Sequence, residues 1–401
     1  MLVVAPHPDD EALGAGGLMA KRRQAGHEVF VALLTVGDGF KEDAARYYLS
    51  LAVSPEEYLH MGYERQKETL AALERFGVSR DHVFFLGFPD GGLDSLWLSA
   101  WDTDEPWTSP TTGKNRVPYV TARKPDAPYR GETLRDLLME LYQSVRPTQL
   151  VMPSAFDTHP DHWATNAFAT LAWAEMARQM PAWRSMVRLG YLIHWPAWPM
   201  VLAYRPKMAE EPPSGLSQLE EEPWHQEPLE SWTVETKRDA LMQYQSQVEL
   251  IMPFMLAFCR RSEAFAVESA WRPARTADGW MMKNPPQDWV TRSVRKTNPL
   301  ARLTVQRDGM VVEWWKKPPK GAVLEAALKP IDGKGRNYLV RMGEGEPPPG
   351  VRMELQGNRW RIVWPKDWLS GADTVMVGAQ ALVEGKSVGK IPFRVLPWEV
   401  G

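Results

Sequence analysis

The sequence predicts an α/β protein with a mainly parallel sheet and helices on both faces, followed by a small all-β, sandwich-like domain. Two observations support this prediction. Up to about residue 270, short apolar runs alternate with longer segments of helical periodicity, as in β–α–β units. Beyond Asn298, short stretches of alternating apolar and polar residues are separated by turns, which is typical of antiparallel sheets. We therefore expect two domains, residues 1–295 and residues 296–401.

The alternation of elements in the first domain is that of a Rossmann-like fold. The apolar segments expected to form its strands are residues 2–5, 27–35, 83–86, 149–152 and 187–195. The segments with apolar residues every three or four positions, expected to form helices, are residues 12–22, 55–76, 131–145, 163–177, 234–248 and roughly 254–266. In the second domain, Asp308 and Gly309 predict the turn of a hairpin.

Two long stretches, residues 93–130 and 196–232, have no steady periodicity. Loops of this length are usually functional or disordered. Trp97, Trp101 and Trp107 in the first stretch fit the lip of a substrate site and fit equally a loop packed against its own aromatics. The prolines and glutamates of the second stretch argue against a regular element there.

Composition limits the classes of function. A hydrophobic fraction of 44% with 24% charged residues is typical of globular proteins, and a net charge of −3 gives no reason to expect a nucleic-acid partner. The single cysteine, Cys259, lies in an apolar run and excludes an intrachain disulfide or a multi-cysteine zinc site. No stretch is long and apolar enough to cross a bilayer. We expect a cytoplasmic protein, with export after removal of a leader as the alternative; a homo-oligomer is compatible with the sequence.

The first chemical motif is the run from His7 to Glu11, with the sequence His-Pro-Asp-Asp-Glu. It follows the first predicted strand and precedes the first helix, and in open parallel sheets ligands bind at this end of the strands. His7 and Asp10, three residues apart, can bind one divalent metal, and the adjacent Asp9 can act on water that the metal activates. A single motif of this kind also fits a turn with an N-capping Asp.

The second motif, His159-Pro160-Asp161-His162, follows the fourth predicted strand and begins a helix. If the first and fourth strands are neighbours, the two motifs meet in one crevice. His7, Asp10 and His162 would then suffice for a catalytic zinc with an open position, and Fe²⁺ would fit the same ligands. Asp9 points away from Asp10 and is the candidate base, while His159 is placed to stabilise an oxyanion. The repeated motif argues against two simple turns.

The two motifs together resemble the LmbE-like (PIG-L) family of zinc-dependent N-acetylglucosaminyl deacetylases. The resemblance covers roughly residues 1–270 and includes the late helical segment 237–247. It implies that His7, Asp10 and His162 bind zinc and that Asp9 is the general base. It also implies that His159 stabilises the oxyanion or protonates the leaving amine.

The resemblance assigns further roles outside the metal ligands. Asp161 would orient His159 by a hydrogen bond, and Arg65 and Asp90 resemble the family's contacts to sugar hydroxyls. A surface ion pair is the structural alternative for Arg65 and Asp90. Asp157 stands where some members have a tyrosine. His194 is expected to be a satisfied histidine of the fifth strand, with the rim of the crevice as the alternative.

The function that these motifs favour is removal of an acetyl group from an N-acetylated amino sugar or glycoconjugate by metal-activated water. Another metal-dependent amide or ester hydrolase and a non-catalytic carbohydrate-binding protein remain the alternatives. Trp314, Trp315 and Trp360 fit either a sugar-stacking face on the β domain or its core.

Overall fold

The computed structural model describes residues 1–48, 52–286 and 298–398. The chain forms two compact units. The first comprises Met1–Ala169, Trp183–Pro213 and Trp224–Ser269, and the second Thr170–Ala182, Ser214–Pro223 and Ala270–Gly401. The predicted domain boundary between residues 295 and 296 lies outside the described residues and stays a prediction.

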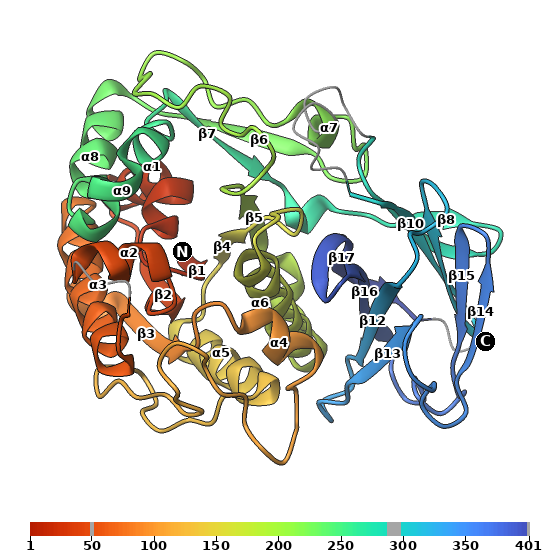
Figure 1. Cartoon of the computed structure of the whole chain (residues 1–401). Helices are drawn as coiled ribbons and strands as arrows, with labels where there is room; N and C mark the ends of the chain where they lie inside the picture. The colour runs from red at the N-terminus through yellow and green to blue at the C-terminus, as the bar shows by residue number, and fades with distance from the viewer. Residues whose placement is uncertain (49–51, 287–297, 399–401) are drawn as a thin grey trace. The chain divides into compact units, whose positions relative to one another are not determined.

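The first unit is built on a mixed sheet whose strands, among the described residues, have the order β3-β2-β1-β4-β5-β7-β6 (Figure 1). The strands are β1 (Leu2–Ala5), β2 (Phe30–Thr35), β3 (Val83–Phe88), β4 (Gln149–Pro153), β5 (Val187–Tyr191), β6 (Trp224–Pro228) and β7 (Ser262–Ala266). The strands from β3 to β5 are parallel, and β7 is antiparallel to β5 and β6. The predicted mainly parallel sheet is therefore confirmed.

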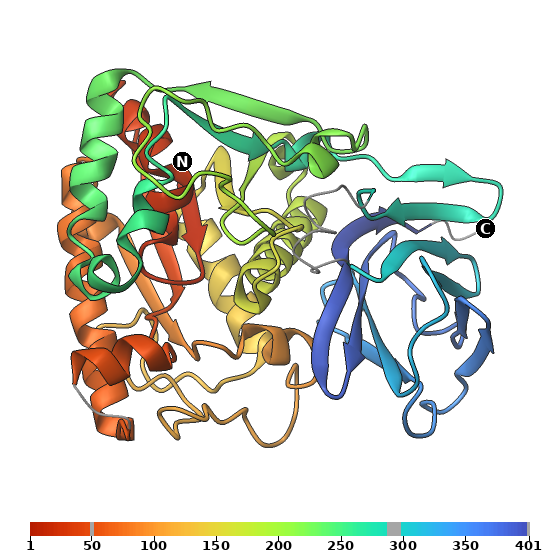
Figure 2. The ribbon, with the colours of Figure 1, turned by 45° about the horizontal axis from the view of Figure 1, so that its top comes forward.

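Helices pack on the sheet from two sides. Figures 1 and 2 show α1, α3 and α8 on one side and α5 and α6 on the other. The helices of the first unit are α1 (Asp10–Gln24), α2 (Lys41–Tyr47), α3 (Pro55–Arg75), α4 (Leu93–Leu98), α5 (Gly131–Val145), the first half of α6 (Pro160–Gln179), α8 (Ser231–Leu241) and α9 (Gln245–Leu256). Because the sheet is covered on both faces, all of β1 is apolar and fully buried.

Local sequence sets where α3 begins. The Ser54 side chain accepts a hydrogen bond from the Glu57 backbone, and the Glu57 carboxylate accepts one from the Ser54 backbone. Pro55 occupies the first turn, where its missing N–H costs nothing. This start places Arg65 on the buried face of α3.

Three sequence expectations were wrong near the end of the first unit. Residues 254–266 do not form one helix, because α9 ends at Leu256 and residues 262–266 pair as strand β7 with both β5 and β6. Strand β6 lies in the stretch expected to be irregular; it is an edge strand that ends at Pro228, where a missing N–H is tolerated. Strand β5 ends at Tyr191, four residues earlier than expected.

The second unit contains two antiparallel sheets, of order β14-β15-β11-β10-β9-β8 and β13-β12-β16-β17 among the described residues. Its strands are β8 (Ala274–Thr276), β9 (Gly279–Lys283), β10 (Leu300–Gln306), β11 (Gly309–Trp314), β12 (Ala322–Pro330), β13 (Tyr338–Met342), β14 (Arg352–Gln356), β15 (Arg359–Val363), β16 (Thr374–Val383) and β17 (Lys386–Pro397), and its short helix is α7 (Ser214–Ser217). An all-β region with antiparallel sheets is thus confirmed, including the hairpin at Asp308.

The tryptophans of the second unit separate into core and surface. Trp314 and Trp360 are buried among apolar side chains from both sheets, with their ring centroids 5.1 Å apart. Trp315 is 46% exposed. Trp314 and Trp360 are therefore core residues, and their alternative role as a sugar-stacking face is excluded.

Candidate active site

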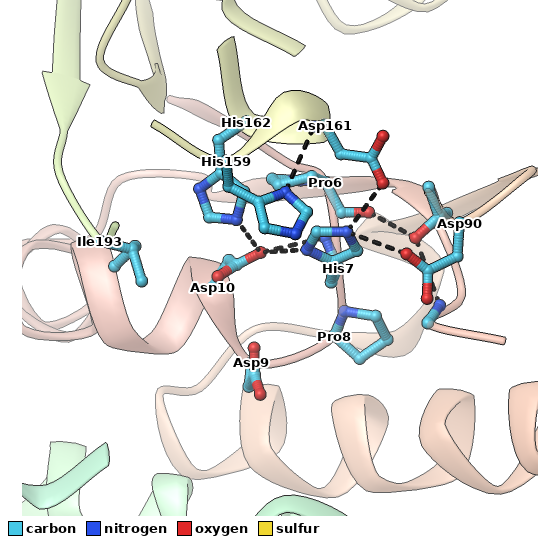
Figure 3. Close-up of polar contacts among 12 residues, drawn as sticks. Pro6, His7, Pro8, Asp9, Asp10, Asp90, His159, Asp161, His162 and Ile193 are labelled. Atoms are coloured by element: carbon cyan, nitrogen blue, oxygen red, sulfur yellow. Dashed lines mark hydrogen bonds and ion pairs between the residues drawn. The ribbon is translucent and has the colours of Figure 1, made fainter. Parts of the chain in front are cut away.

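The site lies where the order of the parallel strands changes direction. β1 pairs with β2 on one side and with β4 on the other, so the crevice at their carboxyl ends is the switch point of the sheet. His7 follows β1, and His159 follows β4 (Figure 3). The expectation that the two motifs meet is confirmed.

Three side chains converge as metal ligands would. The Oδ2 atom of Asp10 lies 3.0 Å from Nδ1 of His7 and 3.2 Å from Nε2 of His162. A tetrahedral metal with bonds of 2.0–2.1 Å separates its ligand atoms by roughly 3.3 Å. The donor set, two imidazoles and one carboxylate, therefore fits a small divalent metal such as zinc.

The second ring nitrogen of His7 and that of His162 each lie close to a carboxylate. Nε2 of His7 lies 3.1 Å from Asp90 and 3.1 Å from Asp161, and Nδ1 of His162 lies 3.2 Å from Asp157. Metal-binding histidines usually donate their second N–H to such a partner, which orients the ring. The arrangement beyond the three ligands thus also fits a metal centre.

The carboxylates behind the histidines are held by backbone amides. Asp161 accepts hydrogen bonds from the N–H groups of Gly91 and Leu93, at 2.7 and 2.9 Å. Asp157 accepts from Ile193 and His194, at 3.0 Å each. Both carboxylates are fully buried, so these amides offset part of their desolvation.

Electrostatics within the cluster favour a cation. Burial opposes the charged form of His162, but Asp10 and Asp157 outweigh it and raise the pKa to about 9. Burial likewise opposes a charged His7, yet Asp90, Asp10 and Asp161 raise its pKa well above the ordinary value. The carboxylates therefore create a negative potential that a bound divalent metal would neutralise.

Asp9 has the electrostatic character of a base. Burial raises its pKa well above the ordinary value, the Asp10 carboxylate adds to this effect, and Arg65 opposes it from 3.7 Å. A carboxylate with a raised pKa accepts protons more readily near neutral pH. Figure 3 shows the Asp9 carboxylate apart from the groups that surround Asp10.

His159 is a neutral ring beside His7 and His162. Its centroid lies 5.1 Å from that of His7 and 5.0 Å from that of His162. Burial and the two neighbouring rings lower its pKa to about 4. Its Nδ1 accepts a hydrogen bond from the Asp161 backbone, at 3.2 Å, so the neutral ring carries its proton on Nε2. His159 also forms, with His7 and Asp161, a second, overlapping group of side chains that could hold a metal.

Three other predicted residues lie around the ligands. Arg65 is buried and donates to the carbonyls of Gly37 and Pro8, at 3.0 and 2.8 Å. Asp90 bonds the Gly39 amide, at 2.7 Å, in addition to His7. The contacts of Arg65 and Asp90 to sugar hydroxyls stay predictions. Orientation of His159 by the Asp161 carboxylate also stays a prediction, because the hydrogen bond between these two residues uses the Asp161 backbone amide.

Two residues at the site have contacts that the sequence alone does not show. Asp157, noted only as a departure from the family pattern, supports His162. His194, expected to be a strand histidine with the crevice rim as the alternative, lies beyond the end of β5 with its ring 5.0 Å from His159 and 4.6 Å from His162, stacked on Phe254. Its position next to the strand that carries the second motif follows from the strand order, which the sequence alone does not show.

A family model described as PIG-L, GlcNAc-PI de-N-acetylase, matches residues 2–173. Residues 2–173 are therefore similar to the PIG-L family. The match contains both motifs and the helix with Arg65, and it ends within α6.

Two curated relatives are similar to part of the chain. The 1D-myo-inositol 2-acetamido-2-deoxy-α-D-glucopyranoside deacetylase of Mycobacterium sp. (strain KMS) is 31% identical over 194 residues, 47% of this chain and 56% of that protein. The enzyme of the same name from Kribbella flavida is 30% identical over 194 residues, 46% of this chain and 58% of that protein. The chain thus spans little more than half the length of the curated relatives it matches.

Among solved structures, the N,N′-diacetylchitobiose deacetylase from Pyrococcus horikoshii aligns with 18% identity and a TM-score of 0.41, over 67% of this chain and 83% of that chain. A conserved protein from Thermus thermophilus aligns with 22% identity and a TM-score of 0.39, over 64% and 83%. In the part of the chain that the structure describes, no helix has the length and apolar character needed to cross a bilayer.

Proposed function

We propose that this protein is a metal-dependent hydrolase that removes an acetyl group from an N-acetylated amino sugar or glycoconjugate. The observation that carries the proposal is the convergence of His7 and His162 on one oxygen of Asp10. Asp9 and a neutral His159 stand beside this set, within the segment that matches the PIG-L family model. The names of the curated relatives support an acetamido sugar as the substrate class.

The proposed metal is zinc, held by His7, Asp10 and His162, with Fe²⁺ as the other candidate. When bound, it would act as a Lewis acid that polarises the amide carbonyl and lowers the pKa of a water molecule. Asp90 and Asp161 keep the His7 ring oriented, and Asp157 does the same for His162. The cluster therefore needs no large rearrangement to bind the ion.

Asp9 transfers the proton, and His159 stabilises the negative charge that develops on the carbonyl oxygen. Asp9 accepts the proton that the attacking water loses as its oxygen bonds to the acyl carbon. His159 donates a hydrogen bond from Nε2 to the carbonyl oxygen, where negative charge develops. Because a neutral His159 would become an anion by losing that proton, Asp9 supplies the proton to the leaving nitrogen. The C–N bond breaks, and acetate and a free amine are released.

Acetate release from a panel of N-acetylated sugars tests the proposal. The panel contains N-acetylglucosamine, its myo-inositol glycoside and N,N′-diacetylchitobiose, each supplied to the zinc-loaded protein. We expect acetate and free amine in equal amounts from at least one glycoside. Metal binding without acetate release from any of them would refute the deacetylase and favour another amide or ester hydrolase. The proposed setting is the cytoplasm, with a small molecule or glycoconjugate as the substrate.

A further inference from the structure

The backbone of Asp9 adopts a conformation that does not form readily on its own. Its φ of +105° and ψ of −32° are unusual for a residue other than glycine. Such conformations cost about 1–3 kcal/mol and persist only where the surroundings hold them. The Asp9 carbonyl accepts from Ala12 and Leu13, at 3.0 and 2.8 Å, and so begins α1. What holds the Asp9 amide therefore decides where the side chain points.

A buried carboxylate binds that amide. Oε2 of Glu11 accepts the Asp9 N–H, at 3.2 Å, and Glu11 is fully buried. The other oxygen of Glu11 accepts a hydrogen bond from the hydroxyl of Tyr244, which is also fully buried. Glu11 thus connects the strained residue to a side chain more than two hundred positions later in the chain.

Tyr244 is itself fixed at the junction of α8 and α9. Its carbonyl accepts from the backbone amides of Gln247 and Val248, at 3.0 and 2.8 Å, in the first turn of α9. Two residues later, Ser246 donates from its amide and its hydroxyl to Glu68 of α3, at 2.8 and 2.7 Å. The hydroxyl of Tyr244 is therefore a rigid anchor tied to α3.

Helices α3 and α8 also contact the start of α1. Arg65, one turn before Glu68 on α3, lies 3.7 Å from the Asp9 carboxylate and donates to the carbonyl of Pro8, at 2.8 Å. On α8, Lys237 donates to the carbonyl of Leu13, at 2.7 Å. The late segment with Tyr244 thus supports the start of α1, which no step of the proposed function explains.

We propose that Tyr244 is a positioning residue for the base Asp9, acting through Glu11. The inference rests on the proposed function for the role of Asp9. Without the hydroxyl, the Glu11 carboxylate rotates away from the Asp9 amide, and the Asp9 backbone relaxes to a negative φ. The Asp9 carboxylate then no longer lies where it can accept the proton of the attacking water, while the proposed metal ligands keep their positions.

Tyr244→Phe tests the inference in the full-length, zinc-loaded protein, with Tyr142→Phe as the matched control. Tyr142 is equally buried, and its hydroxyl donates to the carbonyl of Ala169, at 3.1 Å. We expect Tyr244→Phe to lower kcat roughly 10- to 100-fold, because small misplacements of a catalytic group have effects of this size. KM and metal stoichiometry should not change. An unchanged kcat, or equal losses in both variants, would overturn the inference.

Glu11→Gln tests the same path, which is the pair of hydrogen bonds that connects Tyr244 through Glu11 to Asp9. If Tyr244 acts through Glu11, the double variant Glu11→Gln/Tyr244→Phe should lose no more kcat than the worse single variant. Additive losses would contradict the path, because they would show that the two side chains act independently. The comparison does not depend on the stability of either single variant alone.

A crystal structure of Tyr244→Phe separates this inference from the proposed function. Absence of acetate release by the wild-type protein would refute the function and leave the geometry to be tested. Rotation of Asp9 away from φ +105° in the variant, with His7 and Asp10 in place, would support the positioning role. An Asp9 backbone that is the same in variant and wild type would overturn it.

Discussion

Replacing Asp157 by asparagine should weaken metal binding without displacing any ligand. The Asp157 carboxylate lies 3.2 Å from Nδ1 of His162 and accepts hydrogen bonds from the amides of His159, Ile193 and His194, at 3.0 Å each. Every one of these partners is a donor. An asparagine keeps one accepting oxygen, so its NH₂ group must face a donor, and the support of His162 loses its charge.

The size of the effect follows from the loss of a charged partner of His162, a proposed metal ligand. Removing such partners typically lowers metal affinity by 10- to 100-fold, which is about 1.4–2.8 kcal/mol. We expect the Kd for Zn²⁺, measured by competition with a chromogenic chelator near pH 7, to rise by this factor. Folding should be retained, because the side-chain volume does not change.

Asp126→Asn is the control for this measurement. Asp126 forms an ion pair with Arg116 on the surface, at 2.8 Å, and such exposed pairs contribute about 0–1 kcal/mol. Its Zn²⁺ affinity should equal that of the wild type. A Kd for Asp157→Asn within a factor of about two of the wild type would refute the inferred support of His162.

Three further variants test packing and electrostatics. Burial raises the pKa of Glu210 to about 8, with Glu263 adding to the effect and Lys237 opposing it. The folded protein therefore loses stability as the pH rises from about 4.5 to 8. At about pH 9, Glu210→Gln should be more stable than the wild type by up to roughly 4 kcal/mol in urea unfolding, with the exposed Glu211→Gln as the control. Ser54→Ala removes the capping box of α3 and should cost about 1 kcal/mol, seen as a lower unfolding midpoint; an unchanged midpoint would contradict the cap. Trp314→Ala should cost about 3–5 kcal/mol, and Trp315→Ala, at an exposed position, less than about 1; equal losses would contradict the assignment of Trp314 to the core.

The parts of the site that could be predicted are those encoded in short runs of sequence. The apolar run of β1 and the His-Pro-Asp motifs after β1 and β4 define both their own elements and their chemistry. The two motifs lie close together because β1 and β4 are neighbouring strands, as a doubly wound strand order provides. Local sequence and global fold agree there.

The missed elements depend on contacts between distant residues. Strand β7 contains alanine and glutamate, which favour helices, and becomes a strand because it pairs with β5 and β6. Its Glu263 accepts from the amides of Gly17 and Leu18, at 2.7 and 2.8 Å, and forms an ion pair with Lys237. None of these partners is near it in sequence, so periodicity alone could not reveal the strand.

The same reason explains the residues missed at the site. Asp157, Glu11 and Tyr244 contact other polar groups around the site, and such contacts have no pattern of their own in the sequence. Asp90 was predicted as a sugar contact, and its bonds to His7 and Gly39 became visible only in the structure. Contacts of this kind are found from geometry, whereas candidate ligands and a candidate base are found from motifs.

The most direct test of the central claim compares Asp9→Asn with Asp10→Asn for bound zinc and for acetate release. The proposed roles predict that the wild type and Asp9→Asn bind about one zinc ion per chain, and that Asp10→Asn binds it weakly. Only the wild type should release acetate at an appreciable rate. Full activity in Asp9→Asn, or a folded wild-type protein that binds no metal, would contradict the claim.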